Sequence, residues 1–270
     1  MRVLKFTLAY DGTRFVGWQR QADGESIQGL LEQALAQFQG APVTVHGAGR
    51  TDAGVHALGQ VVSASVTFTH PTGTIVRALN ALLPGDIRIL EVADAALDFH
   101  ARFSARTKTY RYHIRAGTIG DPFTRAFVWH LAEPLDVAAM KNAAASLVGT
   151  HDFTAFQSAG TDVASSVRTI FRSELRAVDG FRGPVGPAPH AADQSSGADL
   201  LAPRETLVYE VTADGFLRHM VRAIVGTLVE IGRGWRPAES MAQLITGGTR
   251  AEAGATAPPH GLFLVSVDYD

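Results

Sequence analysis

The sequence predicts an α+β fold with two similar halves, because strand and helix patterns occur in a comparable order twice. Near the N-terminus, apolar and polar side chains alternate from Val3 to Tyr10, which is typical of a strand with one buried face. Residues 27–38 instead carry apolar side chains three and four positions apart, as on one face of a helix. A similar set of patterns begins after about residue 103, and the related segments "LAYDGTRF" and "VTADGFLR" suggest an internal duplication.

The first predicted domain, residues 1–103, alternates strands and helices. Ser26 is a suitable N-cap and Gly40 a suitable stop for the first helix. A strand is expected over 59–68, a helix over 74–83 that stops at Pro84, and a strand over 87–93. This composition favours one mostly antiparallel sheet with helices packed on one face.

The second predicted domain, residues 104–270, has the same character. Strands are expected over 108–116, 167–178, 205–216 and 261–269, and helices over 136–149, 216–232 and 237–248. Asp136 is the expected N-cap and Gly149 the expected stop of the first of these helices. The region of about 180–203 is rich in Gly, Pro, Ala and Ser and lacks apolar periodicity, so we expect a flexible surface loop.

The composition limits the classes of function. With 270 residues, 46% of them apolar, the chain has enough material for a packed core. A net charge of -2 means that a polyanionic partner would have to be held by a local basic patch. The absence of cysteine excludes disulfides, thiolate metal sites and cysteine nucleophiles. No apolar stretch is typical of a signal peptide or a membrane span, so a soluble, cytoplasmic protein is expected.

Two clusters of basic residues stand out. Residues 99–120 contain five arginines and lysines, no acid, and interleaved aromatic side chains. This combination suits a nucleic-acid backbone with stacked bases, although a solvated strand face is the alternative. The second cluster lies along the predicted helix at 216–232, where Arg218, Arg222 and Gly226 are spaced by four. Gly226 would allow another group to approach this helix closely.

The segment "HGAGRTDAGVHALGQ" is the most unusual local pattern. Gly47, Gly49 and Gly54 surround Arg50 and Asp52. An anion-binding nest is one interpretation, although a central carboxylate would repel an anion. A structural turn capped by the aspartate is another, and a metal site is a third. The residues of that metal site would be His46, Asp52 and His56.

The segment "GAGRTDAGVHALGQVV" resembles the signature of the TruA-type tRNA pseudouridine synthases. The segments "YDGTRFVGWQRQ", "DFHARFSARTKTYRYHI", "FLRHMVRAIVGTL" and "GATAPPHGLFLVSVDY" also follow in family order. The resemblance covers nearly the whole chain apart from the region around 180–203. It implies two similar domains with the active-site cleft between them.

The resemblance also implies roles for individual residues. Asp52 corresponds to the catalytic nucleophile, Arg222 to the arginine that pairs with it, Tyr110 to the tyrosine that stacks on the target base, and Arg50 to a residue that contacts the flipped nucleotide. A carboxylate in a pocket that excludes water stays ionised beside a guanidinium, which is the role expected of Arg222. Further RNA contacts are expected from basic residues of the two clusters and the N-terminal loop: Arg14, Arg20, Arg102, Arg106, Lys108 and Arg218.

The implied activity is isomerisation of uridine to pseudouridine at tRNA positions 38, 39 and 40, by a homodimer whose subunits both contact the tRNA. The reaction breaks the N1–C1′ bond and joins C5 to C1′ without net redox change, so no cofactor and no metal is expected. Attack at C1′, attack at C6 and a glycal route all remain open for an ionised carboxylate. The alternatives are a non-catalytic RNA-binding protein of the same fold and a metal hydrolase.

Overall fold

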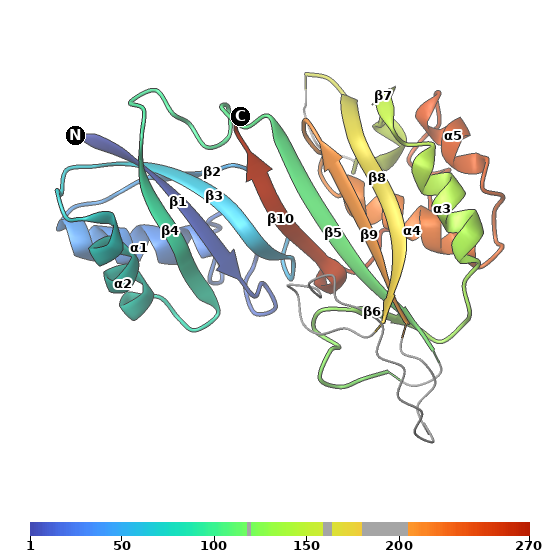
Figure 1. Ribbon diagram of the computed structural model, residues 1–270, viewed down its shortest axis with the longest axis horizontal. Helices are drawn as coiled ribbons and strands as arrows, with labels where there is room; N and C mark the ends of the chain where they lie inside the picture. Colours follow the sequence, from blue (N-terminus) through green and yellow to red (C-terminus); the bar gives the residue numbers. More distant parts are fainter. Residues whose placement is uncertain (118–119, 159–163, 180–204) are drawn as a thin grey trace. The chain divides into compact units, whose positions relative to one another are not determined.

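The computed structural model describes residues 1–117, 120–158, 164–179 and 205–270 (Figure 1). The chain forms two compact units, which are described separately here. Unit 1 comprises Met1–Tyr110, Thr212–Gly215 and Leu262–Asp270, and unit 2 comprises Arg111–Val211 and Phe216–Gly261. The loop predicted at about 180–203 lies outside the described residues. None of the helices in the described ranges has an apolar run long enough to span a bilayer.

Unit 1 is built on four strands in the order β4-β1-β3-β10, with the short strand β2 added to β3. Strand β1 is antiparallel to both of its neighbours, whereas β10 runs parallel to β3. The elements are β1 (Arg2–Tyr10), α1 (Ile27–Gln39), β2 (Val45–Gly47), β3 (His56–Val66), α2 (Thr72–Leu82), β4 (Ile87–Ala95) and β10 (Leu262–Asp268).

The burial of side chains along β1 confirms the predicted alternation of apolar and polar positions. Leu4, Phe6 and Leu8 are fully buried on one face, whereas Lys5 and Thr7 on the other face are partly exposed. Complete burial of such a side chain stabilises the fold by about 1.5–3 kcal/mol. This face of the strand therefore forms the centre of the core of unit 1.

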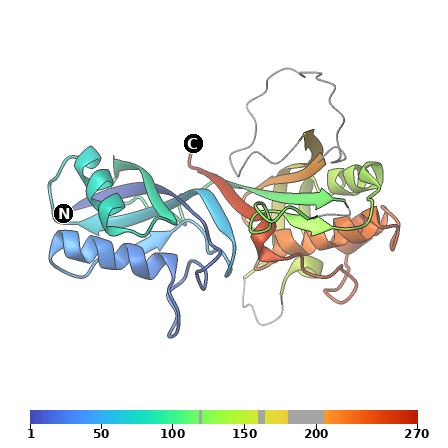
Figure 2. The ribbon, with the colours of Figure 1, turned by 90° about the horizontal axis from the view of Figure 1, so that it is seen from below.

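Helix α1 begins and ends at the residues that the sequence predicts. The side chain of Ser26 accepts a hydrogen bond from the backbone N–H of Gly29, and Gly40 ends the helix in the left-handed conformation with φ 76°. Figure 2 shows α1, in blue, along one side of the strands of unit 1. Ile27 and Leu31 on its inward face are fully buried.

Strand β10 brings the end of the chain back to unit 1. Phe263 is in register with His56, and Leu264 with Ala57, so that β10 lies beside β3 (Figure 1). A side chain at Gly59 would place its Cβ 2.5 Å from the carbonyl oxygen of Val265. Glycine is thus needed at this position for the two strands to approach each other.

Unit 2 contains the strand order β5-β9-β8-β7, with β6 paired in parallel with β5. Strand β7 is antiparallel to β8. The elements are β5 (Thr107–Ala116), β6 (Trp129–Leu131), α3 (Val137–Ala145), β7 (Gly149–Asp152), β8 (Val167–Asp179), β9 (Glu205–Ala213), α4 (Met220–Gly232) and α5 (Ser240–Ile245). The α+β class predicted from the sequence is confirmed.

One predicted helix end in unit 2 is wrong. Asp136 caps α3 as expected, since its carboxylate accepts from the backbone N–H of Ala139 at 2.9 Å. The helix however ends at Ala145 rather than near Gly149. Gly149, with φ 120°, instead begins β7. A glycine permits this backbone at a strand start as readily as at a helix end, so the sequence signal was ambiguous.

Candidate active site

The glycine-rich segment forms the connection between β2 and β3, and Asp52 lies at its turn. The backbone N–H of Val55 donates to the carbonyl of Asp52 at 3.1 Å, and Gly54 adopts the left-handed conformation with φ 75°. Asp52 itself is partly exposed, between a buried Thr51 and an exposed Ala53. A tight turn therefore presents the aspartate, as the glycine content of the segment predicts.

Two buried side chains from neighbouring strands hold this turn. The phenol of Tyr10, at the end of β1, lies 2.8 Å from the hydroxyl of Thr51. Gln60 of β3 donates through Nε2 to the carbonyl of Gly49 at 2.9 Å and to the phenol oxygen of Tyr10 at 3.4 Å. The backbone immediately before Asp52 is thus fixed to two strands of the core.

The segment after β1 packs against the other side of the same turn. The backbone N–H of Trp18 donates to the carbonyl of Thr51 at 3.0 Å. A Cβ at Gly12 would lie 2.0 Å from the carbonyl oxygen of Val55, and one at Gly17 would lie 2.7 Å from that of Thr51. Gly17 also has φ 106°. These contacts explain why two glycines occur in the segment "YDGTRFVGWQ".

Tyr110 on β5 lies close to the turn. It is 8% exposed, and a Cβ at Gly49 would lie 3.8 Å from its phenol oxygen. Burial, with smaller contributions from Tyr10 and Asp52, raises the pKa of Tyr110 above its ordinary value of 10.0. The interaction with Asp52 means that unit 1 brings two of the four predicted site residues together.

Gly49 and Lys108 border the same region. A Cβ at Gly49 would be about 4.0 Å from Cδ and Cε of Lys108, which is an ordinary van der Waals distance. Unlike Gly12 and Gly17, Gly49 is therefore not required by the packing of the protein itself. Its lack of a side chain leaves space next to Tyr110 that a substrate can use.

Arg222 belongs to unit 2, in the first turn of α4. Its Nε donates to the carbonyl of Ala257 at 2.8 Å, and the backbone N–H of Ala257 donates back to the carbonyl of Arg222 at 3.0 Å. The N-cap residue that precedes this helix, His219, has φ 63°, which is unusual for a residue other than glycine. Its Nδ1 lies 2.6 Å from the hydroxyl of Ser158.

The chain around Ala257 is anchored along α4. The backbone N–H of Gly254 donates to the hydroxyl of Thr227, and that of Ala255 to the carboxylate of Glu230, both at 2.9 Å. A Cβ at Gly226 would lie only 1.6 Å from the carbonyl oxygen of Ala255. Gly226 thus admits a close neighbour, as predicted, and this neighbour is a segment of the chain itself.

The predicted RNA contacts differ in how their charges are used. Arg14 forms ion pairs with Asp86 at 2.8 Å and Glu25 at 2.6 Å, and Arg20 with Glu32 at 3.2 Å. Carboxylates already compensate both arginines, which weakens the case for phosphate contacts there. Like Arg14 and Arg20, the following predicted residues have exposed side chains: Arg50, Arg102, Arg106 and Arg218.

A cluster of tilted rings, His46, His100 and Phe103, lies beside Arg102. The rings of His46 and His100 are 4.8 Å apart, and those of His100 and Phe103 are 4.4 Å apart. Phe103 is 77% exposed, and the guanidinium of Arg102 lies 5.6 Å from its centre. Aromatic rings with an adjacent cation are suited to single-stranded RNA, so RNA binding by this part of the basic run stays a prediction.

The proposed metal site is not supported by the geometry. His56 is 1% exposed; its Nδ1 lies 3.0 Å from the backbone nitrogen of Gly12 and 3.1 Å from the carboxylate of Asp11. His46 instead belongs to the ring cluster beside Arg102. Within the described ranges, no three His, Cys, Asp or Glu residues gather as a metal site would require.

No local pattern in the sequence identifies the residues that support the turn. The alternation of β1 predicts Tyr10 only as a strand position, and no pattern points to Thr51 or Gln60. A buried tyrosine hydroxyl normally finds a partner, so the alternation that buries Tyr10 was the available signal. The partner itself lies 41 residues away and could not be inferred from local patterns.

The chain is similar to known proteins over most of its length. The family model described as tRNA pseudouridine synthase matches residues 7–104 and 143–270, well over half of the chain. A protein named tRNA pseudouridine synthase A from Moorella thermoacetica is 44% identical over 271 residues, covering all of both chains. Its namesake from Solidesulfovibrio magneticus is 45% identical over 275 residues, covering all of this chain and 92% of the other. A third, from Anoxybacillus flavithermus, is 41% identical over the full length of both chains. The chain belongs to the tRNA pseudouridine synthase family.

Proposed function

We propose that this protein isomerises uridine to pseudouridine in tRNA, with Asp52 as the nucleophile. One observation carries this assignment. Asp52 directly follows Thr51, whose side chain is fixed by a buried hydrogen bond to Tyr10, and Asp52 also interacts with the buried Tyr110. A carboxylate presented on a braced turn beside an aromatic ring matches the needs of a reaction on one extruded base. Membership in the family supports the same reaction.

The chemistry needs few groups. The N1–C1′ bond breaks, the base turns, C5 bonds to C1′, and the proton on C5 is lost while N1 gains one, so atoms balance without a co-reactant. The carboxylate of Asp52 acts on the nucleoside as nucleophile or, in the glycal route, removes a proton from the sugar. We favour the glycal route, as the resemblance of the sequence implies.

Tyr110 is assigned to the extruded base. Removing a base from a stacked stem costs a few kcal/mol. Stacking on an aromatic side chain recovers about 1–3 kcal/mol. The open space at Gly49, next to the phenol of Tyr110, is consistent with a base or ribose at this position. The exposed Arg50 is assigned to the same nucleotide.

Arg222 is assigned as the partner of the Asp52 carboxylate, as the resemblance of the sequence implies. Its Nε donates to the carbonyl of Ala257 at 2.8 Å, which anchors the guanidinium. A planar guanidinium offers a carboxylate two parallel hydrogen bonds, which lysine does not.

The finer assignment follows the resemblance. We propose uridines 38, 39 and 40 of the anticodon stem-loop as the targets, a cytoplasmic location, and a homodimer in which tRNA contacts both subunits. The exposed Arg102 and Arg106, together with the ring of Phe103, support RNA contacts on unit 1, and the exposed Arg218 supports one on unit 2.

The test is incubation of unmodified tRNA with purified protein, followed by mapping of pseudouridine at each position. The wild type should modify the stem-loop uridines and release tritium from C5-labelled uridine. Asp52→Asn and Asp52→Ala should form no product while their affinity for tRNA persists. Turnover by either variant would remove Asp52 from the mechanism. Loss of activity in excess EDTA would instead favour a metal-dependent reaction.

A further inference from the structure

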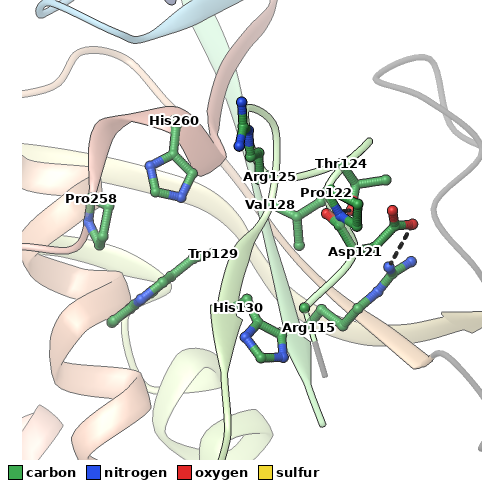
Figure 3. A pocket seen from close by; sticks show the side chains of 11 residues that line it. Arg115, Asp121, Pro122, Thr124, Arg125, Val128, Trp129, His130, Pro258 and His260 are labelled. Carbon is green, nitrogen blue, oxygen red and sulfur yellow. Dashed lines mark hydrogen bonds and ion pairs between the residues drawn. The ribbon is translucent and has the colours of Figure 1, made fainter. Parts of the chain in front are cut away.

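A cavity of about 480 Å³ lies within unit 2, where β5, β6 and the segment around Pro258 meet (Figure 3). Its volume lies in the range of small-molecule sites. Its walls combine arginine and histidine side chains with flat apolar surfaces. None of its residues has a role in the reaction described above.

One wall carries a buried arginine with unused donors. Arg115, near the end of β5, is 5% exposed, and within the described part of the chain its Nε and Nη1 have no hydrogen-bond partner. The closest carboxylate, that of Asp121, is 3.5 Å from Nη1, the contact drawn as a dashed line in Figure 3. A charge-assisted hydrogen bond is normally about 2.7–2.9 Å long. Desolvated donors of this kind are costly unless an acceptor is supplied.

Two further basic side chains face the same space. His130 of β6 is in register with Arg115 of β5, and its buried Nε2 also lacks a hydrogen-bond partner in the described residues. Arg125 lines the cavity with an exposed side chain. The two arginines outnumber the single Asp121, so the cavity favours an anionic ligand.

The opposite wall is suited to a planar group. Trp129, Pro258 and His260 line it (Figure 3). Trp129 is held by the buried ring of Tyr112, with the two ring centres 6.2 Å apart. Indole and imidazole rings beside arginine donors are the elements that bind a base and its phosphate together.

We propose that this cavity binds one nucleotide of the tRNA, with the phosphate at Arg115, Arg125 and His130 and the base against Trp129. The inference rests on the proposed function, since it takes tRNA as the ligand. The cavity also adjoins the anchor of Arg222: Pro258 follows Ala257, and the phenol of Tyr112 donates to the carbonyl of Pro258 at 2.7 Å. A bound nucleotide would therefore stabilise the segment that positions Arg222.

The first test is the salt dependence of tRNA binding by the full-length protein. The logarithm of the association constant for tRNA falls linearly with the logarithm of the salt concentration. Loss of one phosphate contact decreases the magnitude of this slope by about 1. Arg125→Gln and Arg115→Met should each show that decrease, with a several-fold weaker affinity at low salt, and Arg115→Lys should recover part of it. Arg77→Gln, an exposed arginine of α2 whose guanidinium contacts Thr74, is the matched control and should keep the wild-type slope.

The second test follows the imidazole of His130 by NMR. Uridine monophosphate should shift its resonance at lower concentration than inorganic phosphate, and uridine alone should have the weakest effect. Unchanged salt slopes for Arg125→Gln and the folded Arg115→Met would overturn the proposal, as would equal responses to phosphate and the nucleotide. Asp52→Asn separates the two proposals, because it should lose product formation and still show the decrease in slope when combined with Arg125→Gln.

Discussion

The phenol of Tyr10 and the hydroxyl of Thr51 form a buried hydrogen bond of 2.8 Å one residue before Asp52. Gln60 extends this contact to the carbonyl of Gly49. The backbone on the N-terminal side of the aspartate is therefore tied to β1 and β3, the centre of the core in unit 1. Precise placement of a reacting group depends on such supporting contacts, and errors of about 1 Å reduce rates strongly.

Replacing Tyr10 by phenylalanine should slow catalysis more than it weakens tRNA binding. The change leaves the buried hydroxyl of Thr51 without its partner, at a cost of about 1–3 kcal/mol in the free energy of unfolding. We expect kcat to fall by about tenfold or more because the turn loses its support. Single-turnover kinetics and denaturant unfolding measure the two effects.

Tyr209→Phe is the matched control for this variant. Its phenol is equally buried and lies 2.9 Å from the hydroxyl of Ser173 in unit 2. It should lose a similar amount of stability and keep its kcat. If both variants show the same kcat, Tyr10 has no role beyond stability.

Stability should decline at high pH, and Tyr10 should account for part of the decline. Burial is the largest cause that raises its pKa, from 10.0 to about 12. A folded-state pKa above the unfolded value contributes stability that is complete below pH 10 and is lost as the pH rises through 12. For one buried phenol this amounts to about 2–3 kcal/mol.

The alkaline decline is measured by denaturant unfolding at a series of pH values from 9 to 12. All five tyrosines have pKa values raised mainly by burial, so Tyr10→Phe should reduce the decline without removing it. Identical pH profiles for the variant and the wild type would contradict the assignment of Tyr10.

Local signals in the sequence predicted local structure well. Ser26 and Gly40 delimit α1, and Asp136 caps α3, because a cap acts on neighbouring backbone groups. The α+β class followed from the two periods of apolar residues. The glycine-rich turn around Asp52 was likewise expected, since few other structures need so many permissive residues in ten positions.

The same patterns could not predict contacts between residues that are far apart in the sequence. The pairing of Phe263 with His56 joins opposite ends of the chain, and the bond between Tyr10 and Thr51 crosses 41 residues. Gly226 shows the limit clearly: its spacing indicated a close approach, but only the structure identifies the carbonyl of Ala255 as the neighbour.

Tyr110→Phe should retain most of the activity, which would exclude the phenol as the base for the C5 proton. Burial raises its pKa above 10.0, so the phenol is neutral near pH 7, and a neutral phenol is a weak base. Phenylalanine keeps the aromatic surface on which the base stacks. Tyr110→Ala removes this surface and should raise the free-energy barrier of the reaction by about 1–3 kcal/mol. Rates of pseudouridine formation under single-turnover conditions decide this. A loss in Tyr110→Phe as large as that in Tyr110→Ala would restore a chemical role for the hydroxyl.

Two glycines near Asp52 should respond differently to alanine. Gly17→Ala forces φ 106° on a residue with a side chain and places Cβ 2.7 Å from the carbonyl of Thr51, so we expect a loss of about 2–4 kcal/mol in stability. Gly49→Ala meets the protein only at 3.8 Å and should fold normally. Its methyl group occupies space assigned to the substrate, so its kcat/KM should fall. Thermal unfolding and steady-state kinetics separate the cases, and normal kinetics for Gly49→Ala would show that the substrate does not use this space.

Replacing Arg222 by lysine should impair catalysis although the charge is kept. Lysine lacks the Nε donor that bonds to the carbonyl of Ala257 at 2.8 Å, and it offers no planar pair of donors to a carboxylate. We expect kcat to fall by about a hundredfold, with a small change in tRNA affinity. Arg218→Lys is the control. Arg218 is an exposed arginine four residues before Arg222, and this variant should keep its kcat.

The pairing of Arg222 with Asp52 is tested separately by a double-mutant cycle in stability. If the two side chains interact, the effects of Arg222→Ala and Asp52→Ala on the free energy of unfolding should deviate from additivity by about 0.5–3 kcal/mol. Removal of Asp52 should then make the loss of Arg222 less costly, because the guanidinium has already lost its carboxylate partner. Strict additivity, together with a normal rate for Arg222→Lys, would mean that Arg222 does not pair with Asp52.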